Sequence, residues 1–228
     1  MKDLPFIRKD IKRPDPELIR RASRFQAAIL ADVGGRRGTL NGSIQSRGPG
    51  MKVAGPAFTV EVRPGDNLMF HAALALAQPG DVIVVEGKGD LTAALCGTIM
   101  VTQAQTIGLA GFVVDAATRD TEEISVGTFP VFSAGTNPNG PTKSLGGRIN
   151  WPVTLAGTTV NPGDLIVGDD DGVVVVPQEN IEQILLLAEQ KVRAEAARIA
   201  EIGKGNVGAS WLADALVQAG VLKQGDVL

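Results

Sequence analysis

The sequence predicts an α/β domain that ends in a long helix. Between residues 81 and 135, short apolar runs typical of buried strands alternate with segments of helical spacing. Residues 178–203 then have the apolar periodicity of one long amphipathic helix. A chain of 228 residues is long enough to enclose its core in one domain. We therefore expect a single domain over residues 1–228, with a C-terminal helical extension from about 178 to 228.

The first third of the chain is expected to combine two helices with short strands. Apolar residues at helical spacing predict a helix over residues 14–35, which stops at a Gly-Gly pair. A glycine-rich loop over 36–50 and one or two strands over 51–62 follow. The next helix, over 64–80, has Asp66 as its expected N-cap and ends at Pro79 and Gly80.

The middle of the chain carries the alternating pattern. We expect a buried strand over 81–87, a small-residue helix over 90–108 interrupted at Gly97, and a second buried strand over 109–117. A turn leads into a short helix over 118–124, and a further strand covers 129–135. Residues 135–147 are typical of a surface loop, and short strands separated by turns occupy the region from 144 to 177.

Composition argues against several classes of partner. The 22 basic and 25 acidic side chains give a net charge of −3, so no excess of positive charge indicates nucleic acid. The N-terminus is too charged for a signal peptide, and no apolar run reaches the roughly 18 residues of a membrane span. The single cysteine, Cys96, cannot form an internal disulfide. We expect a cytoplasmic protein that binds neither membrane nor nucleic acid.

Several kinds of chemistry are also excluded. His71 is the only histidine, so a histidine-rich metal site cannot form within one chain, and we expect this side chain to be packed or hydrogen-bonded inside its helix. No phosphate-binding loop and no G-x-S-x-G nucleophile motif occurs. Lys88 lies between two glycines, which is a poor setting for the desolvated amine that a Schiff base needs.

The segment "VVDAATRDTEEI", residues 113–124, is the strongest candidate site. A buried strand ends here, and in open α/β sheets such strand ends hold ligands. Arg119 offers a planar fork for a carboxylate, and Asp120 offers a hard oxygen ligand for a cation. The alternative is structural, because Asp120 and Glu123 also match an N-cap and its reciprocal acid in a capping box. The spacing alone leaves both readings open.

Two other segments are weaker candidates. In "EGKGDLTAALCGTIM", residues 86–100, a glycine-rich loop feeds a helix, where backbone amides can bind an anion, although glycines before helices are common. In "GDDDGVVVVP", the three consecutive aspartates lack the spacing of a calcium loop, so we expect a turn into a core strand.

The same segments carry a resemblance to a known family. "PGDVIVVEGKGDLTAALCGTIMVTQAQTIGLAGFVVDAATRDTEEI", with "GDNLMFHAALALAQ" before it and "NWPVTLAGTTVNPGDLIVGDDDGVVVVP" after it, resembles the RraA-like family over nearly the whole chain. The resemblance implies a β/β/α swivelling-type domain that assembles as a trimer or a pair of trimers. The family includes divalent-metal aldolases acting on 4-hydroxy-4-methyl-2-oxoglutarate and 4-carboxy-4-hydroxy-2-oxoadipate, and also non-enzymatic regulators of ribonuclease E.

The resemblance implies roles for several residues of this chain. Asp120 resembles the metal ligand, and Arg119 resembles the residue that binds substrate and stabilises developing negative charge. The aldolases generally have an acidic residue directly after the glycine that Gly97 matches, and this chain has Thr98 there. Glu195 or Glu201 would supply the acid that these enzymes take from a neighbouring subunit. The backbone that resembles the pyruvate-binding loop consists of Gly97, Thr98, Ile99 and Met100.

The resemblance implies a metal-dependent aldolase that cleaves a 4-hydroxy-2-oxo di- or tricarboxylic acid and releases pyruvate. Mg²⁺, or Mn²⁺ in its place, would be the cofactor, because a site with one carboxylate suits a cation that keeps several waters. Oxaloacetate decarboxylation is expected as a side activity. Two alternatives stay open: a regulator of ribonuclease E without enzyme activity, and a related keto-acid decarboxylase.

Overall fold

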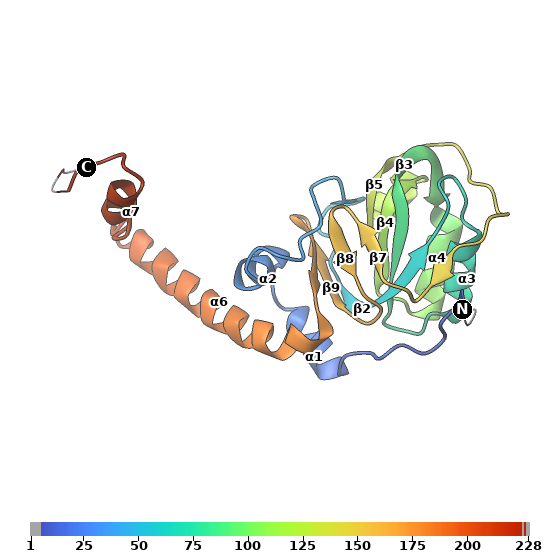
Figure 1. Cartoon of the computed structure of the whole chain (residues 1–228), viewed down its shortest axis with the longest axis horizontal. Helices are drawn as coiled ribbons and strands as arrows, with labels where there is room; N and C mark the ends of the chain where they lie inside the picture. The colour runs from blue at the N-terminus through green and yellow to red at the C-terminus, as the bar shows by residue number, and fades with distance from the viewer. Residues whose placement is uncertain (1–5, 225, 227–228) are drawn as a thin grey trace, which may run out of the picture. The chain divides into compact units, whose positions relative to one another are not determined.

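The computed structural model describes residues 6–224 and 226 (Figure 1). Contacts divide the chain after Ala188 into a first compact unit, up to that residue, and a second unit from Glu189 onward. The candidate site lies in the first unit, which contains all the strands and the helices that pack on them.

A mixed sheet forms the centre of the first unit. Its four inner strands are parallel from β2 to β5, and antiparallel strands extend it at both edges, in the order β1-β5-β4-β3-β2-β9-β10, with β6 paired to β2. Parallel strands place their carboxyl ends at one edge, which is where the candidate residues follow β3 and β4. The strands are β1 (Gln45–Ser46), β2 (Val53–Glu61), β3 (Val82–Cys96), β4 (Gly111–Thr118), β5 (Val131–Thr136), β6 (Arg148–Ile149), β9 (Leu165–Asp169) and β10 (Gly172–Val176).

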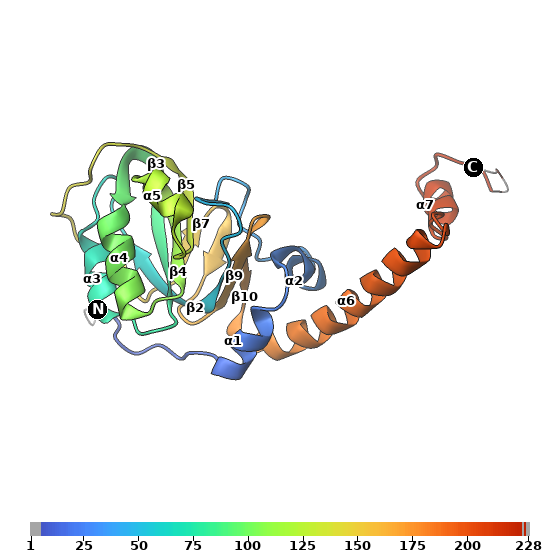
Figure 2. The same cartoon turned by 180° about the vertical axis from the view of Figure 1, so that it is seen from behind.

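The two faces of this sheet are covered differently. Helices α3 (Leu68–Leu76), α4 (Thr98–Ile107) and α5 (Thr121–Val126) lie on one face, and the hairpin of β7 (Val153–Leu155) and β8 (Thr158–Val160) lies on the other (Figures 1 and 2). The result is a β/β/α layering, which confirms the predicted fold class.

Burial on both faces explains the apolar strand sequences. Every residue of β4 is buried, because the strand is flanked by β3 and β5 and covered by both layers. Phe112 of β4 meets Phe70 and Phe129 edge to face, each with ring centroids 4.9 Å apart. A second apolar cluster joins the N-terminal helices to β9, β10 and the first turns of the last long helix.

The helix expected over residues 14–35 is wrong as a single element. The chain forms α1 (Pro16–Ala22) and α2 (Ala27–Val33), with a break between them at which Gln26 is extended. The Ala27 amide donates to Asp169 Oδ2 at 2.8 Å, so a carboxylate distant in sequence satisfies the start of α2. Helical spacing continues across the break, and only this tertiary contact shows where it lies.

The helix expected over residues 90–108 is also corrected. β3 runs on through Cys96, and Asp90, Ala94 and Cys96 pair with β4 across several register irregularities. The helix begins only after Gly97. Pairing with β4 gives the small residues of this stretch their backbone partners, and it replaces the expected glycine-rich loop with an irregular strand.

Helix α3 begins at Leu68, so its N-cap is Asn67, one residue after the expected Asp66. Asp66 still accepts from the Leu68 amide, at 2.9 Å. Asp169 ends β9, and Asp170 and Asp171 form the turn into β10, as expected.

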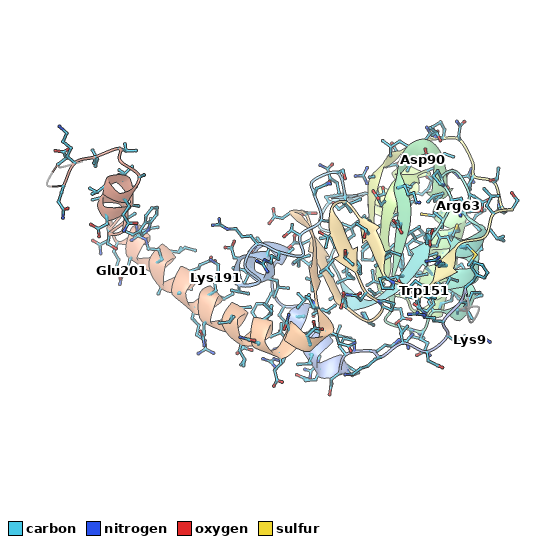
Figure 3. The ribbon with its side chains drawn as sticks, viewed as in Figure 1. Lys9, Arg63, Asp90, Trp151, Lys191 and Glu201 are labelled. Atoms are coloured by element: carbon cyan, nitrogen blue, oxygen red, sulfur yellow. The ribbon has the colours of Figure 1, made fainter. Side chains whose placement is uncertain are left out.

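The C-terminal helical extension is confirmed by a short 3₁₀ turn, η1 (Gln178–Asn180), followed by α6 (Ile181–Gly203) and α7 (Leu212–Gln218). The expected apolar stripe is buried at Ile181, Leu185 and Ala188. Within the second unit, Lys191 and Glu201 project from α6 (Figure 3). Over the described ranges, no helix has both the length and the hydropathy of a membrane-crossing segment.

Candidate functional site

The candidate site forms where two strand-to-helix junctions meet. β3 leads through Gly97 into α4, and β4 leads through Arg119 and Asp120 into α5. The Arg119 amide donates to the Cys96 carbonyl at 3.0 Å, which ties the two junctions together. Residues 97–100 and 119–120, which were expected to come from adjacent elements of one sheet, therefore share one sheet edge.

Asp120 does not cap its own helix. It occupies the N-cap position of α5 in the left-handed region, at φ 58°, and its side chain makes no capping bond there. Instead, Oδ2 accepts a hydrogen bond from the Thr98 amide at the start of α4, at 2.9 Å. The capping-box alternative is therefore wrong for Asp120. A carboxylate at a helix N-terminus is electrostatically favoured, and its side chain remains 36% exposed, so it can still bind a ligand.

Gly97 makes this arrangement possible. A Cβ atom at this position would overlap Asp120 Oδ2 and would lie 3.0 Å from the Arg119 side chain. Arg119 Nε lies 3.7 Å from Asp120 Oδ1, so a cationic fork and a carboxylate stand side by side. The absence of a side chain at residue 97 is thus a steric requirement of the site.

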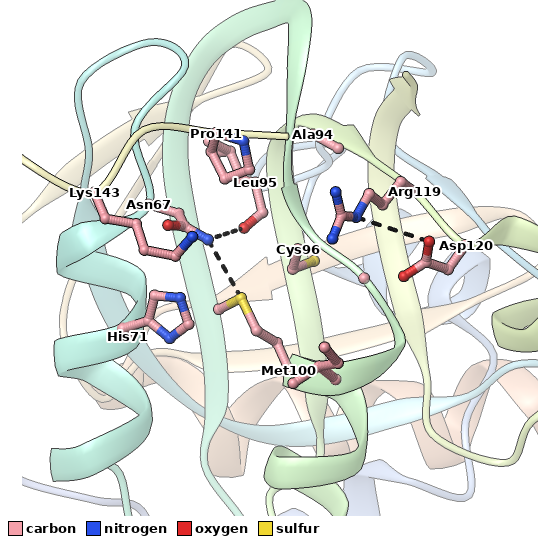
Figure 4. Close-up of a pocket in the computed structure, with 12 residues that line it drawn as sticks. Asn67, His71, Ala94, Leu95, Cys96, Met100, Arg119, Asp120, Pro141 and Lys143 are labelled. Atoms are coloured by element: carbon pink, nitrogen blue, oxygen red, sulfur yellow. Dashed lines mark hydrogen bonds and ion pairs between the residues drawn. The ribbon is translucent and has the colours of Figure 1, made fainter. Parts of the chain in front are cut away.

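A cavity of about 180 Å³ opens beside this pair (Figure 4). Its volume is below the roughly 300–1,000 Å³ of sites for drug-sized ligands, which indicates a small ligand. Arg119 and Asp120 lie on one side, while Asn67, His71 and Lys143 lie on the other, with Cys96 and Met100 between them. The remaining lining residues are Ala94, Leu95, Gly97, Ile99 and Pro141.

The side formed by Asn67, His71 and Lys143 was missed by the sequence analysis. Asn67 and His71 are one helical turn apart on α3, and the 135–147 loop brings Lys143 to them. The motif "DNLMFH" carried the signal: two polar side chains at i and i+4 on an otherwise apolar helix. His71 was expected to be satisfied by packing or hydrogen bonding.

Asp66 positions the loop that carries Lys143. Its Oδ2 accepts from the Thr142 hydroxyl at 2.7 Å and from the Ser144 and Leu145 amides at 2.7 and 3.1 Å. Burial opposes the charged form of this carboxylate, but hydrogen bonds from Ser144, Leu68, Thr142 and Leu145 outweigh burial and lower its pKa to about 2.

Unpaired polar atoms lie on Asn67 and His71, which line the cavity, and on Thr98, which is next to the lining residues Gly97 and Ile99 in the sequence. Asn67 Oδ1, His71 Nε2 and Thr98 Oγ1 are buried and have no hydrogen-bond partner within the described part of the chain. Asn67 is only 3% exposed, and its amide nitrogen is already used by the Leu95 carbonyl at 2.8 Å. A buried polar atom without a partner costs about 1–3 kcal/mol, and active sites are one place where this cost is retained.

The other acidic residues of the 113–124 segment do not line the cavity. Asp115 is buried within β4, where burial raises its pKa and the amides of Gly89 and Ala156 partly offset this effect. Glu122 and Glu123 are exposed on α5. In the second unit, Glu195 pairs with Lys191 at 3.2 Å, and Glu201 pairs with Lys204 at 2.8 Å.

The donor set suits a hard cation that keeps water. Over the residues that the structure describes, no group of three or more His, Cys, Asp or Glu side chains could share a metal ion. Asp120 offers the oxygen Oδ1, which is not bonded to the Thr98 amide and lies 3.7 Å from Arg119 Nε. Magnesium sites in enzymes commonly use one or two carboxylates together with substrate oxygens and water, so these residues fit such an ion.

Comparison with known proteins identifies the family. The model of the RraA-like family, described as Aldolase/RraA, matches residues 21–175. The chain belongs to the RraA-like family. It is 43% identical over 159 residues to a Halalkalibacterium halodurans protein named "Putative 4-hydroxy-4-methyl-2-oxoglutarate aldolase", covering 70% of this chain and 76% of that protein.

Solved structures in the same family include proteins described as inhibitors. Streptomyces coelicolor RraAS2, described as an unusual member of the RNase ES inhibitor RraA family, is 33% identical with a TM-score of 0.75, over 83% of this chain and 98% of that chain. The RNA-processing inhibitor RraA from Thermus thermophilis is 29% identical with a TM-score of 0.62, over 67% and 93% of the respective chains. The fold thus carries more than one function.

Proposed function

We propose that this RraA-like protein is a metal-dependent pyruvate aldolase that cleaves a 4-hydroxy-2-oxo di- or tricarboxylic acid into pyruvate and a second keto acid. One observation carries the proposal: Asp120 and Arg119 meet the N-terminus of α4 at the edge of a small cavity. That edge combines a cation ligand, a carboxylate-binding fork and a helix start that favours anions.

Asp120 would hold Mg²⁺, or Mn²⁺ in its place. The bound ion would act as a Lewis acid on the keto and carboxylate oxygens of the substrate. Because its Oδ2 atom is held by the Thr98 amide, the Asp120 carboxylate is oriented before any ligand arrives. Arg119 would hold the oxygen on which negative charge develops as the carbon–carbon bond breaks.

The start of α4 would bind the substrate carboxylate. The Thr98 amide already donates to Asp120 Oδ2, and the Met100 amide donates to the Gly97 carbonyl at 3.1 Å. Among the amides of Thr98, Ile99 and Met100 at the start of α4, the Ile99 amide is therefore the one that would bind an anion. Removing carbon dioxide from oxaloacetate produces the same pyruvate enolate, so decarboxylation follows as a side activity.

A homo-oligomer completes the proposal. The second unit exposes large apolar side chains, among them Ile199 at 68% and Trp211 at 67%. Such side chains suit docking on a second copy of the chain, which would bring Glu195 or Glu201 to a neighbouring site.

The second candidate function is a binding regulator of an RNA-degrading enzyme. The similarity to the two inhibitor structures favours it. Arg119 and Asp120 do not by themselves decide between the two functions, and the enzyme is proposed first because a small cavity with unpaired polar atoms suits a small-molecule substrate.

The test is pyruvate release from 4-carboxy-4-hydroxy-2-oxoadipate, 4-hydroxy-4-methyl-2-oxoglutarate and oxaloacetate, with Mg²⁺ or with a chelator. Asp120→Asn keeps an acceptor for the Thr98 amide but removes the charge, and we expect it to abolish metal-dependent turnover. Glu123→Ala, an exposed acid in the same helix, is the matched control and should retain the wild-type rate. A folded wild type that releases no pyruvate from any of the three acids would overturn the proposal.

A further inference from the structure

The proposed lyase reaction needs a group that moves a proton, and Thr98 is not ionisable in the usual range. We propose that His71 is this proton-transfer residue. The inference rests on the proposed function and assigns a role to the cavity side formed by Asn67, His71 and Lys143.

The geometry places His71 opposite the cation-binding side. His71 lines the cavity from α3, across Cys96 and Met100 from Arg119 and Asp120 (Figure 4). A substrate whose keto acid end is held by Arg119 and the start of α4 extends its far end toward α3. The C4 hydroxyl belongs to that far end, so it approaches His71 rather than Asp120.

Two unpaired atoms mark this side as a binding surface. His71 Nε2 is buried without a partner, and so is Asn67 Oδ1, which belongs to a residue that is 97% buried on the same face of α3. Asn67 Oδ1 can only accept, so it suits a hydroxyl of the substrate. A ligand with a hydroxyl group here would give the Asn67 oxygen the donor that the protein does not provide.

Other ionisable groups around His71 are poorly suited to accept a proton. From the 135–147 loop, Lys143 presents an ammonium group; from β3, Cys96 has a pKa raised to about 12, by burial and then by Asp120. α4 contributes none, since residues 98–107 contain no ionisable side chain. Arg119 is a permanent cation, and Asp120 is assigned to the metal. Asp66, just before α3, is held by the loop amides.

The surroundings also keep the imidazole neutral. Burial, and then the positive charge of Lys143, lower the pKa of His71 below its ordinary value of 6.5. At neutral pH the side chain therefore carries a lone pair that can take a proton. Lys143 acts on the protonation of His71 without taking part in the transfer.

The step balances without any further reagent. The neutral imidazole takes the proton of the C4 hydroxyl, the C4–O bond becomes a carbonyl, and the C3–C4 electron pair moves to C3. This releases the second keto acid and leaves the pyruvate enolate with Arg119. The imidazolium then returns its proton to C3, which completes the methyl group of pyruvate and restores neutral His71.

A single histidine makes the test unusually direct. In untagged full-length protein, the only imidazole signal in a proton NMR titration belongs to His71 and reports its pKa. We expect the acid limb of the pH profile of kcat/KM to have the same midpoint, below 6.5. His71→Gln should remove that limb and lower kcat by about 10²–10⁴-fold, the usual contribution of a general base.

Two further measurements exclude a structural explanation. Mn²⁺ affinity and pyruvate affinity of His71→Gln should match the wild type, because the metal and carboxylate sites lie across the cavity. Exchange of the pyruvate methyl protons with D₂O, which needs only proton transfer at C3, should be lost in parallel with cleavage. His71→Asn provides a second variant should His71→Gln fail to fold.

The outcomes separate the two proposals. A wild type that cleaves substrate, with a His71 variant that keeps both its rate and its acid limb, overturns the role of His71 and leaves the aldolase standing. A wild type with neither cleavage nor exchange overturns both.

Discussion

Gly97→Ala tests the steric basis of the site with a single added methyl group. Gly97 has φ −155°, which any residue adopts, so the substitution causes no backbone strain. The new Cβ would overlap Asp120 Oδ2 and crowd the Arg119 side chain at 3.0 Å. The Asp120 carboxylate must therefore turn away, and the bond from the Thr98 amide is lost.

The structure sets the size of the effect. A hydrogen bond to a charged group contributes about 1.5–3 kcal/mol, and the lower part of that range applies because the Asp120 side chain is 36% exposed. Replacing glycine by alanine also lowers the conformational entropy of the unfolded chain, which stabilises the folded state by about 0.4–1 kcal/mol. The net loss is about 1 kcal/mol, which corresponds to a decrease in Tm of about 2–4 °C for a chain of this size.

The effect on function should be much larger than the effect on stability. Displacing the carboxylate removes the proposed metal ligand, so we expect Mn²⁺ affinity to fall by at least about tenfold and pyruvate release to fall with it. Gly42→Ala is the matched control, because a Cβ there meets nothing within 4 Å. Thermal unfolding and Mn²⁺ titration of both variants make the comparison. If Gly97→Ala binds Mn²⁺ as tightly as Gly42→Ala, the steric reasoning is refuted.

Three other predictions follow from the same structure. Asp66 has a pKa lowered to about 2 from 3.8, so its contribution to stability is present above about pH 4 and is lost as the pH falls toward 2. In Asp66→Asn, the free energy of unfolding should therefore fall less between about pH 4 and pH 2 than in the wild type, and an equal fall in both proteins would contradict the assignment. Arg13 donates to both oxygens of fully buried Asp81, at 2.7 and 2.8 Å, so Arg13→Met should cost about 3–5 kcal/mol in urea unfolding, whereas a loss below about 1 kcal/mol would show that the pair is dispensable. Burial, and then Asp120, raise the pKa of Cys96 to about 12, so a thiol reagent at pH 8 should label Cys96 only after unfolding; rapid labelling of native protein would show that β3 opens there.

The errors in the secondary-structure predictions share one cause. Residues 14–35 keep helical spacing across a break at which Asp169, distant in sequence, accepts from the Ala27 amide. Residues 90–96 include helix-compatible small side chains, but the stretch is a strand in which Asp90, Ala94 and Cys96 pair with β4. In both places a partner distant in sequence decides the local structure, and a propensity worth a fraction of a kcal/mol per residue cannot resist it.

The candidate site divides in the same way. Arg119 and Asp120 stood out in the sequence because they follow a buried strand, and their motif is typical of the family. The competing reading of Asp120 as a helix cap could not be dismissed from spacing, since the N-cap position itself is correct. The hydrogen bond to the Thr98 amide, 22 residues away, decided it.

The order of most elements and the strand ends at which chemistry was to be sought could be predicted from the residues alone, and the resemblance to the RraA-like family added the β/β/α fold. Periodicity and strand-end polarity are local properties, so they survive without a structure. The packing of the folded chain, in contrast, brings Asn67, His71 and Lys143 to the same cavity as Asp120. Their proximity depends on how elements pack across the sheet, and no spacing along the chain encodes that distance.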